Sequence, residues 1–341
     1  MNFPELTVDF KDTCNMLFTA KMPQIIGTAV DLNLFDTLAA EPMGTDRLAR
    51  ELGTDSSMTQ SLLEILREGG YLAAKAGHYS LNPVAREFFV SSSPAFQGRV
   101  LKSMDKMSTL LGNAREIMTQ GGPVHDETLW ANEEMMETML QGGRGGKVQS
   151  AAAFVSSLPE FSSMRRMCDI AGSFGYFSMG ILDRHPDLSA VVCDLPEVAE
   201  AAGSYIAKAG YEGRLEARGV DLGAGGDFGT GYDLVFVSNY LYEWSLDHRL
   251  VDFLKRVRVA LNPGGVFVSR HMTLDVSGED LKSQLMMEYM TRLGGYPTHA
   301  ISEARLTEAL TQAGFCDFTV RKPEDGSYDN TLDFAARVAA S

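Results

Sequence analysis

The sequence predicts an α/β protein in which a mostly parallel, doubly wound sheet follows a helical N-terminal domain. From residue 166 onward, short apolar runs alternate with segments of helical period, which is typical of strand–helix–strand units. The last two apolar runs are joined only by PEDGSYD, which is too short for a helical crossover and favours an antiparallel hairpin. The first 150 or so residues are instead mostly helical in pattern.

The N-terminal segment has the element order of a winged helix. Helical spacing runs through LFTAKMPQIIGTAVDLNLFDTLAA, and further helices are expected in GTDRLARELG and DSSMTQSLLEILREGG. The next residues, YLAAKAGHYSLN, predict two short strands around a Lys-Ala-Gly turn. Such a domain can bind DNA, but the acidic chain and the leucine-rich second helix favour a dimerisation role.

We expect three segments: a winged-helix dimerisation domain at 1–100, a Met-rich helical linker and substrate wall at 101–160, and the α/β domain at 161–341. Seven strands are expected in the α/β domain, in MCDIAG, AVVCDL, LEARGVDL, YDLVFVSN, GVFVSRHM, FCDFTVRK and NTLDFAARV. Helices fill most of the intervals. Because the final pair should form a hairpin, one strand of the sheet is expected to run in reverse.

Composition excludes several classes of function. The net charge of -15 argues against nucleic-acid binding, which needs a basic surface to displace counterions. The sequence has no run of 18 apolar residues and begins with an acidic segment, so we expect neither a membrane span nor a secretory signal. Its four cysteines are scattered, which predicts a reduced, cytoplasmic protein without a disulfide framework or metal site.

Acidic residues end three successive strands of the predicted sheet. Asp169 precedes a loop that contains Gly172 and Gly175, and Asp194 and Asp221 end the next two strands. Glycines let a ligand approach the backbone, and the carboxyl ends of parallel strands meet at one edge. A dinucleotide could use this crevice, but the loop lacks GxGxxG. Three carboxylates suit a cationic cofactor without phosphate, which favours S-adenosylmethionine.

The chain resembles a known family, the dimerising small-molecule methyltransferases typified by plant caffeic-acid and hydroxyindole O-methyltransferases and their bacterial relatives. The resemblance covers nearly the whole chain and is carried by DIAGSFG, DLPEV, VDL, SNYLYEW, LNPGGVFVSRHM and LGGYPTHAISEARLTEALTQAGF. It implies a class I methyltransferase Rossmann-like sheet with an N-terminal helical winged-helix dimerisation domain. It also implies a homodimer whose N-terminal domains interlock and can lend residues to the partner's pocket.

The resemblance further implies how the methyl donor binds. The loop glycines would lie along its methionine part, Asp194 would bind the ribose, and Asp221 with Leu222 would meet the adenine, with Trp244 near that ring. The predicted cofactor-binding residues are Asp169, Gly172, Gly175, Asp194, Leu195, Asp221, Leu222, Ser238 and Trp244.

The chain departs from the family pattern where the acceptor is expected. The family has a catalytic His, which deprotonates the acceptor hydroxyl, where this chain has Tyr242, and an Asp where it has Glu243. The family usually carries an acid where this chain has His271, and a further acid near Pro297 in the plant members is missing. The predicted catalytic residues are therefore Tyr242, Glu243 and His271. Ala171 and Ser173 also replace loop glycines.

The missing base indicates which acceptor atom receives the methyl group. A positioned base contributes roughly 10²–10⁴-fold to attack by a hydroxyl, and tyrosine, with a pKa of about 10, is a poor base at neutral pH. A thioether sulfur has no proton to lose, and alignment alone can supply about 7–11 kcal/mol. We therefore hypothesise S-methylation of a small thioether carboxylate such as 4-methylthio-2-hydroxybutyrate. The reaction would be similar to that of the bacterial methylthiohydroxybutyrate S-methyltransferases of dimethylsulfoniopropionate synthesis.

An anionic acceptor would suit the arginines near these positions, because a guanidinium binds carboxylate through two parallel hydrogen bonds. Arg270 is next to His271, and side chains alternate along a strand, so only one of the two is expected to face the pocket. The predicted substrate-binding residues are Arg270, Glu288, Tyr289, Arg292 and His299.

Two other functions stay open. Tyr242 or His271 could replace the lost base in an O- or C-methyltransferase that acts on an aromatic or tetrapyrrole acceptor, and bacteriochlorophyll C-methyltransferases resemble this chain in having Tyr at this position. Alternatively, the protein could bind S-adenosylmethionine without catalysis. The intact Asp194, Asp221 and Trp244 favour an enzyme.

Overall fold

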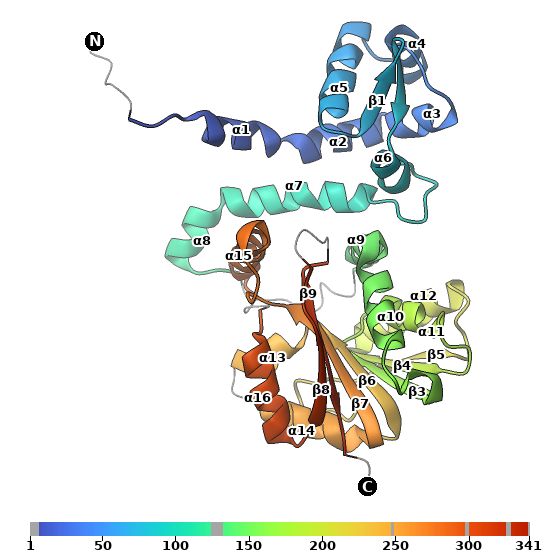
Figure 1. The fold of residues 1–341 in the computed structure, drawn as a ribbon, viewed down its shortest axis with the longest axis vertical. Helices are drawn as coiled ribbons and strands as arrows, with labels where there is room; N and C mark the ends of the chain where they lie inside the picture. Colours follow the sequence, from blue (N-terminus) through green and yellow to red (C-terminus); the bar gives the residue numbers. More distant parts are fainter. Residues whose placement is uncertain (1–6, 124–131, 247–248, 297–299, 325–328, 340–341) are drawn as a thin grey trace. The chain divides into compact units, whose positions relative to one another are not determined.

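The computed structural model describes residues 7–123, 132–246, 249–296, 300–324 and 329–339 (Figure 1). The chain divides into two compact units, Met1–Ser108 and Thr109–Ser341. The domain boundary expected at residue 100 stays a prediction. The separate linker segment at 101–160 stays a prediction.

The first unit is the expected winged helix. Its elements, in chain order, are α1 (Lys11–Thr19), α2 (Met22–Asp31), α3 (Leu34–Ala40), α4 (Thr45–Leu52), α5 (Ser56–Glu68), β1 (Leu72–Lys75), β2 (His78–Leu81) and α6 (Pro83–Phe88). Asp55 caps α5 by accepting a hydrogen bond from the backbone of Met58 at 2.9 Å. Helix α5 buries Leu63 and Leu66 and packs against β1, α2 and α4, so its apolar stripe contributes to the core of this unit.

Helix α7 (Gly98–Gly112) spans the boundary between the units. The second unit then continues with α8 (Ala114–Gln120), α9 (Glu133–Gly142), a π-helical turn at Gly143–Lys147 and α10 (Val148–Ser156). Among the helices that the structure describes, none has an apolar stretch long enough to cross a membrane.

The second unit contains the predicted sheet, whose seven strands run in the order β5-β4-β3-β6-β7-β9-β8. They are β3 (Arg166–Ile170), β4 (Ser189–Asp194), β5 (Leu215–Gly219), β6 (Tyr232–Ser238), β7 (Leu261–Met272), β8 (Cys316–Arg321) and β9 (Thr331–Arg337). Strand β9 pairs antiparallel with both β7 and β8, which confirms the expected hairpin and the single reversed strand.

Two layers of helices cover the sheet, as Figure 1 shows. Helices α10, α11 (Tyr176–Leu182) and α12 (Pro196–Lys208) pack on one face, and α13 (Leu241–Leu246), α14 (Leu250–Ala260) and α16 (Glu303–Ala313) pack on the other. Helix α15 (Gly278–Leu293) follows β7. The near-continuous apolar runs of the central strands reflect burial on both faces.

The strand register fixes which residues share the carboxyl edge of the sheet. Ser238, the last residue of β6, pairs with Arg270, and Arg270 pairs with Asp333 of β9. Met272 at the end of β7 pairs with Thr331, where β9 begins. The end of β7 and the start of β9 therefore lie beside the end of β6.

Candidate active site

Asp169 lies at the carboxyl edge under a glycine. Its carboxylate is buried, and one oxygen accepts a 2.7 Å hydrogen bond from the hydroxyl of Ser178 in α11. Its other oxygen, Oδ1, has no hydrogen-bond partner among the described residues. A Cβ at Gly172 would lie 2.5 Å from the Asp169 carboxyl carbon, so this position requires glycine. The acid is thus held close to any ligand that rests on the loop.

Burial raises the pKa of Asp169 to about 7, and the hydrogen bond from Ser178 opposes the shift only in part. A nearby cation would favour the ionised form and lower this pKa again. A buried carboxylate with an unused oxygen beside a glycine loop fits a cationic ligand such as S-adenosylmethionine. The structure thus brings the predicted acid, Asp169, and the predicted glycine, Gly172, into contact.

The loop after β3 keeps a glycine-like backbone although two glycines are replaced. Ala171 and Ser173 have φ values of 54° and 52°, and Gly175 has 71°. A non-glycine residue in this left-handed region costs roughly 1–2 kcal/mol. The fold thus imposes the glycine-loop conformation on residues that do not favour it.

Asp194 is anchored to the same loop. Its two oxygens accept hydrogen bonds of 2.8 Å each from the backbone N–H groups of Ser173 and Leu195. The carboxylate therefore lies between the loop after β3 and the start of α12. Asp194 is the residue that was predicted from the sequence to bind the ribose. Leu195 is half-buried beside it.

The predicted adenine-binding residues lie in the turn after β5. Asp221 is exposed and accepts a 2.8 Å hydrogen bond from the backbone of Ala224, while Leu222 is buried. Trp244 is only 5% exposed. Its ring stacks on Phe253, with 4.6 Å between the ring centroids, and the guanidinium of Arg249 lies 4.7 Å from the ring centre. Most of the indole face is thus covered by the protein itself.

The segment SNYLYEW begins with a constrained turn. Asn239 has a φ of 52°, and its N–H donates a 2.8 Å hydrogen bond to the carbonyl of Arg270. The buried hydroxyl of Ser238 makes no hydrogen bond within the described structure. Tyr242 and Glu243 follow in the first turn of α13, where Tyr242 is 5% exposed and Glu243 is half-buried.

His271 is a neutral, buried imidazole. It is 1% exposed, and neither ring nitrogen makes a well-formed hydrogen bond to the described residues. Burial lowers its pKa to about 4, and the backbone of Ile301 and the charge of Asp275 oppose this shift without cancelling it. At neutral pH the side chain therefore carries no charge, and it is a weak base.

Arg270 pairs with carboxylates of the protein itself. Its guanidinium is buried, forms an ion pair with Asp329, contacts Asp333 at 3.2 Å and lies 5.7 Å from the ring centre of Phe177. This guanidinium, which was predicted to bind a substrate carboxylate, thus lies against two carboxylates of the protein. Asp333, 63 residues later, meets Arg270 through the pairing of β7 with β9.

Two of the predicted substrate residues of α15, Glu288 and Arg292, pair with each other. Glu288 is buried and accepts a 3.0 Å hydrogen bond from Arg292, whose side chain is mostly exposed. The hydroxyl of Tyr289 contacts the sulfur of Met118 in α8 at 3.4 Å. His299 lies outside the described residues. The positive charge of Arg292 is therefore also partly balanced within the helix.

Two further buried polar groups, on Tyr176 and Lys147, were not predicted from the sequence. Tyr176, the first residue of α11, follows the glycine loop directly, and burial raises the pKa of its hydroxyl. Lys147 ends the π-helical turn, and burial lowers the pKa of its ammonium group. The signal for Lys147 was the glycine-rich break GRGGK, which interrupts the helical pattern.

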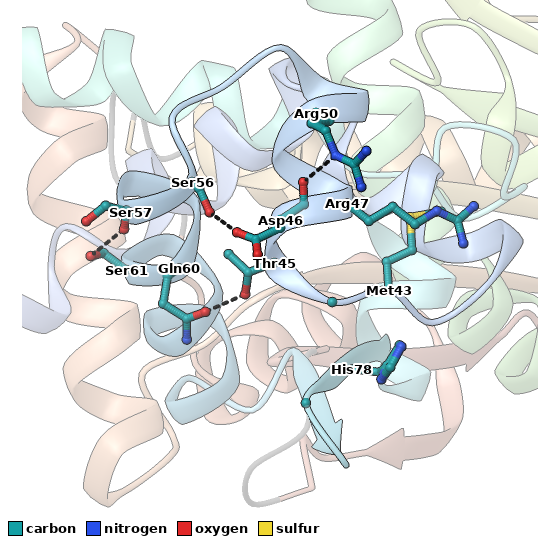
Figure 2. Close-up of a pocket in the computed structure, with 12 residues that line it drawn as sticks. Met43, Thr45, Asp46, Arg47, Arg50, Ser56, Ser57, Gln60, Ser61 and His78 are labelled. Atoms are coloured by element: carbon teal, nitrogen blue, oxygen red, sulfur yellow. Dashed lines mark hydrogen bonds between the residues drawn. The ribbon is translucent and has the colours of Figure 1, made fainter.

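The winged-helix unit has a hollow of its own. It measures about 930 Å³ and lies between α4, α5 and the turn of the wing (Figure 2). Polar side chains line it, and several are paired: Arg47 with Glu41 and Glu51, and Ser56 with Asp46. None of the predicted site residues lines this hollow. In the described part of the chain, no three His, Cys, Asp or Glu side chains are grouped as metal ligands.

Comparison with known protein families decides the class of the protein. A model of the O-methyltransferase domain matches residues 126–316, which is more than half of the chain. The O-methyltransferase dimerisation domain matches residues 14–91. The chain belongs to the O-methyltransferase family. It is a methyltransferase that uses S-adenosylmethionine and dimerises through its N-terminal domain.

Individual O-methyltransferase relatives are similar along most of their length. The chain is 27% identical over 313 residues to the 3-hydroxy-5-methyl-1-naphthoate 3-O-methyltransferase of Streptomyces sahachiroi, covering 89% of each protein. It is 26% identical over 344 residues to the acetylserotonin O-methyltransferase of Rattus norvegicus, covering 94% of this chain and 76% of the relative.

Solved structures confirm the fold. Human N-acetylserotonin methyltransferase in complex with SAM superposes with a TM-score of 0.75 at 20% identity, covering 98% of this chain and 100% of that chain. PigF with SAH gives a TM-score of 0.74 at 20% identity, with 97% and 100% coverage.

Proposed function

We propose that this methyltransferase transfers the methyl group of S-adenosylmethionine to the sulfur of a small thioether acid, of which 4-methylthio-2-hydroxybutyrate is an example. The observation that supports this proposal is the state of the two candidate base positions. Position 242 carries tyrosine, and His271 is buried with a pKa of about 4. A general base is most effective when its pKa lies near the working pH.

A thioether acceptor removes the need for a base. The bound donor supplies a methyl carbon attached to a positively charged sulfur. A lone pair of the acceptor sulfur forms the new S–C bond as the donor's bond to that carbon breaks, so the acceptor becomes the sulfonium and releases no proton. The protein then has to align the two sulfurs and exclude water, and alignment alone can supply about 7–11 kcal/mol.

We assign the following roles within this proposal. Asp169, Gly172 and Gly175 hold the methionine part of the donor, Asp194 with Leu195 the ribose, and Asp221 with Leu222 the adenine, bordered by Ser238 and the edge of Trp244. Tyr242, Glu243 and His271 form the wall that faces the acceptor. The carboxylate of Glu243 would favour the positive charge that the acceptor gains.

The names of the relatives favour a second candidate, transfer to oxygen or carbon. They include the naphthoate 3-O-methyltransferase and, at 23% identity over 323 residues, the L-tyrosine C(3)-methyltransferase of Streptomyces lavendulae. In that case the neutral imidazole of His271 would accept the acceptor's proton, and the low pKa of His271 would make this transfer slow.

The test is a methyl-transfer assay with isotopically labelled S-adenosylmethionine, in which a thioether acid and a phenolic acid compete. We expect the label on sulfur, as a sulfonium product identified by NMR. Label found only in ethers or on ring carbons would contradict the proposal and support the second candidate. Donor binding without turnover of any acceptor would indicate that the protein has lost catalysis. The anionic acceptor and the cytoplasmic location are further parts of the proposal.

A further inference from the structure

Ser173, in the loop after β3, has two features that are unfavourable in the protein alone. Its backbone has a φ of 52°, in the left-handed region where a side chain is strained. Its hydroxyl oxygen is buried and makes no hydrogen bond to any residue that the structure describes. Such a hydroxyl has lost the hydrogen bonds that it makes with water in the unfolded chain. Glycine would avoid both effects, so serine at this position lowers the stability of the ligand-free protein.

The backbone of Ser173 fixes its place at the carboxyl edge of the sheet. Its N–H donates a 2.8 Å hydrogen bond to Oδ2 of Asp194, the last residue of β4. Two residues earlier, the N–H of Ala171 donates a 2.8 Å hydrogen bond to the carbonyl of Cys193. The loop is thus bonded to the end of β4 at two points. Ser173 therefore lies beside the carboxylate that we propose to bind the ribose of the donor.

Two more buried oxygens at this edge have no hydrogen-bond partner among the described residues, Oδ1 of Asp169 in β3 and Oγ of Ser238 at the end of β6. Strand β3 lies between β4 and β6 in the sheet, so the three unpartnered oxygens belong to neighbouring strand ends. Buried polar atoms are nearly always hydrogen-bonded in folded proteins. Their grouping here indicates a polar ligand, and S-adenosylmethionine carries ribose hydroxyls, an ammonium group and a carboxylate.

A second serine close by in the sequence shows the contrast. Ser178 in α11 is also buried, but its hydroxyl donates a 2.7 Å hydrogen bond to Asp169. The fold therefore supplies a partner for the hydroxyl of Ser178 and none, in the part of the chain that is described, for that of Ser173. A hydroxyl can both donate and accept, so it can bond to either kind of group on a ligand.

We propose that the hydroxyl of Ser173 binds the methyl donor, through a hydrogen bond to a ribose hydroxyl of S-adenosylmethionine. The inference rests on the donor site of the proposed function, in which Asp194 binds the ribose, and it does not depend on which acceptor atom is methylated. The bond gives the buried hydroxyl the partner that it lacks in the ligand-free protein. It also gives a reason for serine where the family pattern has glycine. Ser173 thus raises donor affinity while it lowers the stability of the free protein.

The experiment measures dissociation constants by calorimetry for wild type, Ser173→Ala and Ser173→Gly. The ligands are S-adenosylmethionine and methylthioadenosine, which keeps the ribose and lacks the amino-acid part. Ser173→Ala removes only the hydroxyl, whereas Ser173→Gly also relieves the backbone. We expect both variants to bind both ligands about three- to thirty-fold more weakly, because a hydrogen bond is lost and the ribose hydroxyl is left without its partner. Weaker binding of S-adenosylmethionine alone would place Ser173 at the methionine part and overturn the ribose contact.

Thermal melting gives a second readout, which a purely structural role of Ser173 would not change in the same way. Without donor, Ser173→Gly should melt at a higher temperature than wild type, because the strain is relieved. A ligand stabilises a protein according to its concentration relative to its dissociation constant. A fixed concentration of S-adenosylmethionine should therefore raise the Tm of both variants less than that of wild type. Equal rises in all three proteins would contradict the inference.

Ser204→Ala is the matched control, because Ser204 is exposed on α12, and this variant should bind both ligands as wild type does. Asp194→Asn separates the inference from the site on which it rests. If Asp194→Asn binds S-adenosylmethionine as tightly as wild type, the proposed donor site fails. If Asp194→Asn weakens donor binding and folded Ser173→Ala does not, the donor site stands and the inference about Ser173 is wrong.

Discussion

At the scale of single residues, the site depends on two buried titratable groups whose pKa values are shifted in opposite directions. Burial raises the pKa of Asp169 and lowers that of His271, because in both cases it penalises the charged form. In the proposed function, the negative charge of ionised Asp169 stabilises the bound cationic donor. The imidazole of His271 does not need to accept a proton in a methyl transfer that releases none. Each shift leads to a measurable dependence of stability on pH.

His271 should make the protein sensitive to mild acid. The unfolded chain binds a proton at this side chain below about pH 6.5, whereas the folded protein resists protonation until about pH 4. The free energy of unfolding therefore falls as the pH decreases between these values, by about 1.4 kcal/mol per pH unit. Urea unfolding should show wild type losing about 2 kcal/mol more than His271→Phe between pH 7 and pH 5. Equal losses would contradict a buried, neutral imidazole.

Asp169→Asn should raise the free energy of unfolding and lower the affinity for the donor. The folded pKa of about 7 lies above the unfolded value, so ionised Asp169 destabilises the protein without ligand as the pH rises from about 4 to 7. The variant should therefore be more stable than wild type, with a larger difference at pH 8 than at pH 5. Calorimetry should also show donor affinity reduced about ten-fold or more, because a charge-assisted contact is lost. A variant that binds donor as tightly as wild type would exclude Asp169 from the site.

At the scale of secondary-structure elements, the loop after β3 is the clearest case of stored strain. Ala171 and Ser173 hold positive φ values that glycine adopts at little cost. Ala171→Gly or Ser173→Gly should raise the free energy of unfolding by about 1 kcal/mol.

The control for these variants is Ala201→Gly in the interior of α12, where the backbone is helical and glycine should lower stability by about 1 kcal/mol. Thermal melts at one protein concentration compare the three. If both loop variants behave like the helix variant, the loop stores no strain.

Sequence patterns predicted the elements well and the side-chain pairings poorly. The central strands were predictable because strands buried on both faces have to be apolar. The edge strands β5 and β8 are mostly not buried, and they were predicted from the alternation of strands with helices and from the short final connection. The partners of Arg270 were not predictable, since Asp333 meets it only through the pairing of β7 with β9. Likewise, the covering of Trp244 by Phe253 and Arg249 depends on how α13 and α14 pack. Lys147 was not predicted as a buried polar residue, because the GRGGK break interrupts the helical pattern but does not indicate that a π-helical turn forms there.

At the scale of the whole molecule, helix α1 indicates where the dimer forms. The helix has no buried residue, and it exposes Met16, Leu17 and Phe18 to the extent of 57%, 55% and 76%. Exposed apolar residues gathered on one helix are typical of an interface. The dimerisation-domain match begins at residue 14, within this helix.

Phe18→Asp should therefore weaken the homodimer. A charge in an apolar interface remains desolvated and unpaired, so we expect the dissociation constant to rise at least about ten-fold by analytical ultracentrifugation. Val259→Asp is the control, because Val259 is 71% exposed on α14 in the methyltransferase unit. A dimer that resists Phe18→Asp, or that is weakened equally by both changes, would place the interface elsewhere.

In the proposed S-methylation, methyl transfer proceeds by alignment of donor and acceptor, without a general base. The most direct test is the pH dependence of kcat for a thioether acid, measured between about pH 6 and pH 9 with the product identified by NMR. We expect a sulfonium product and a kcat that stays flat over this range in both wild type and His271→Phe. A kcat that rises with pH and collapses in His271→Phe, with an ether as the product, would contradict it.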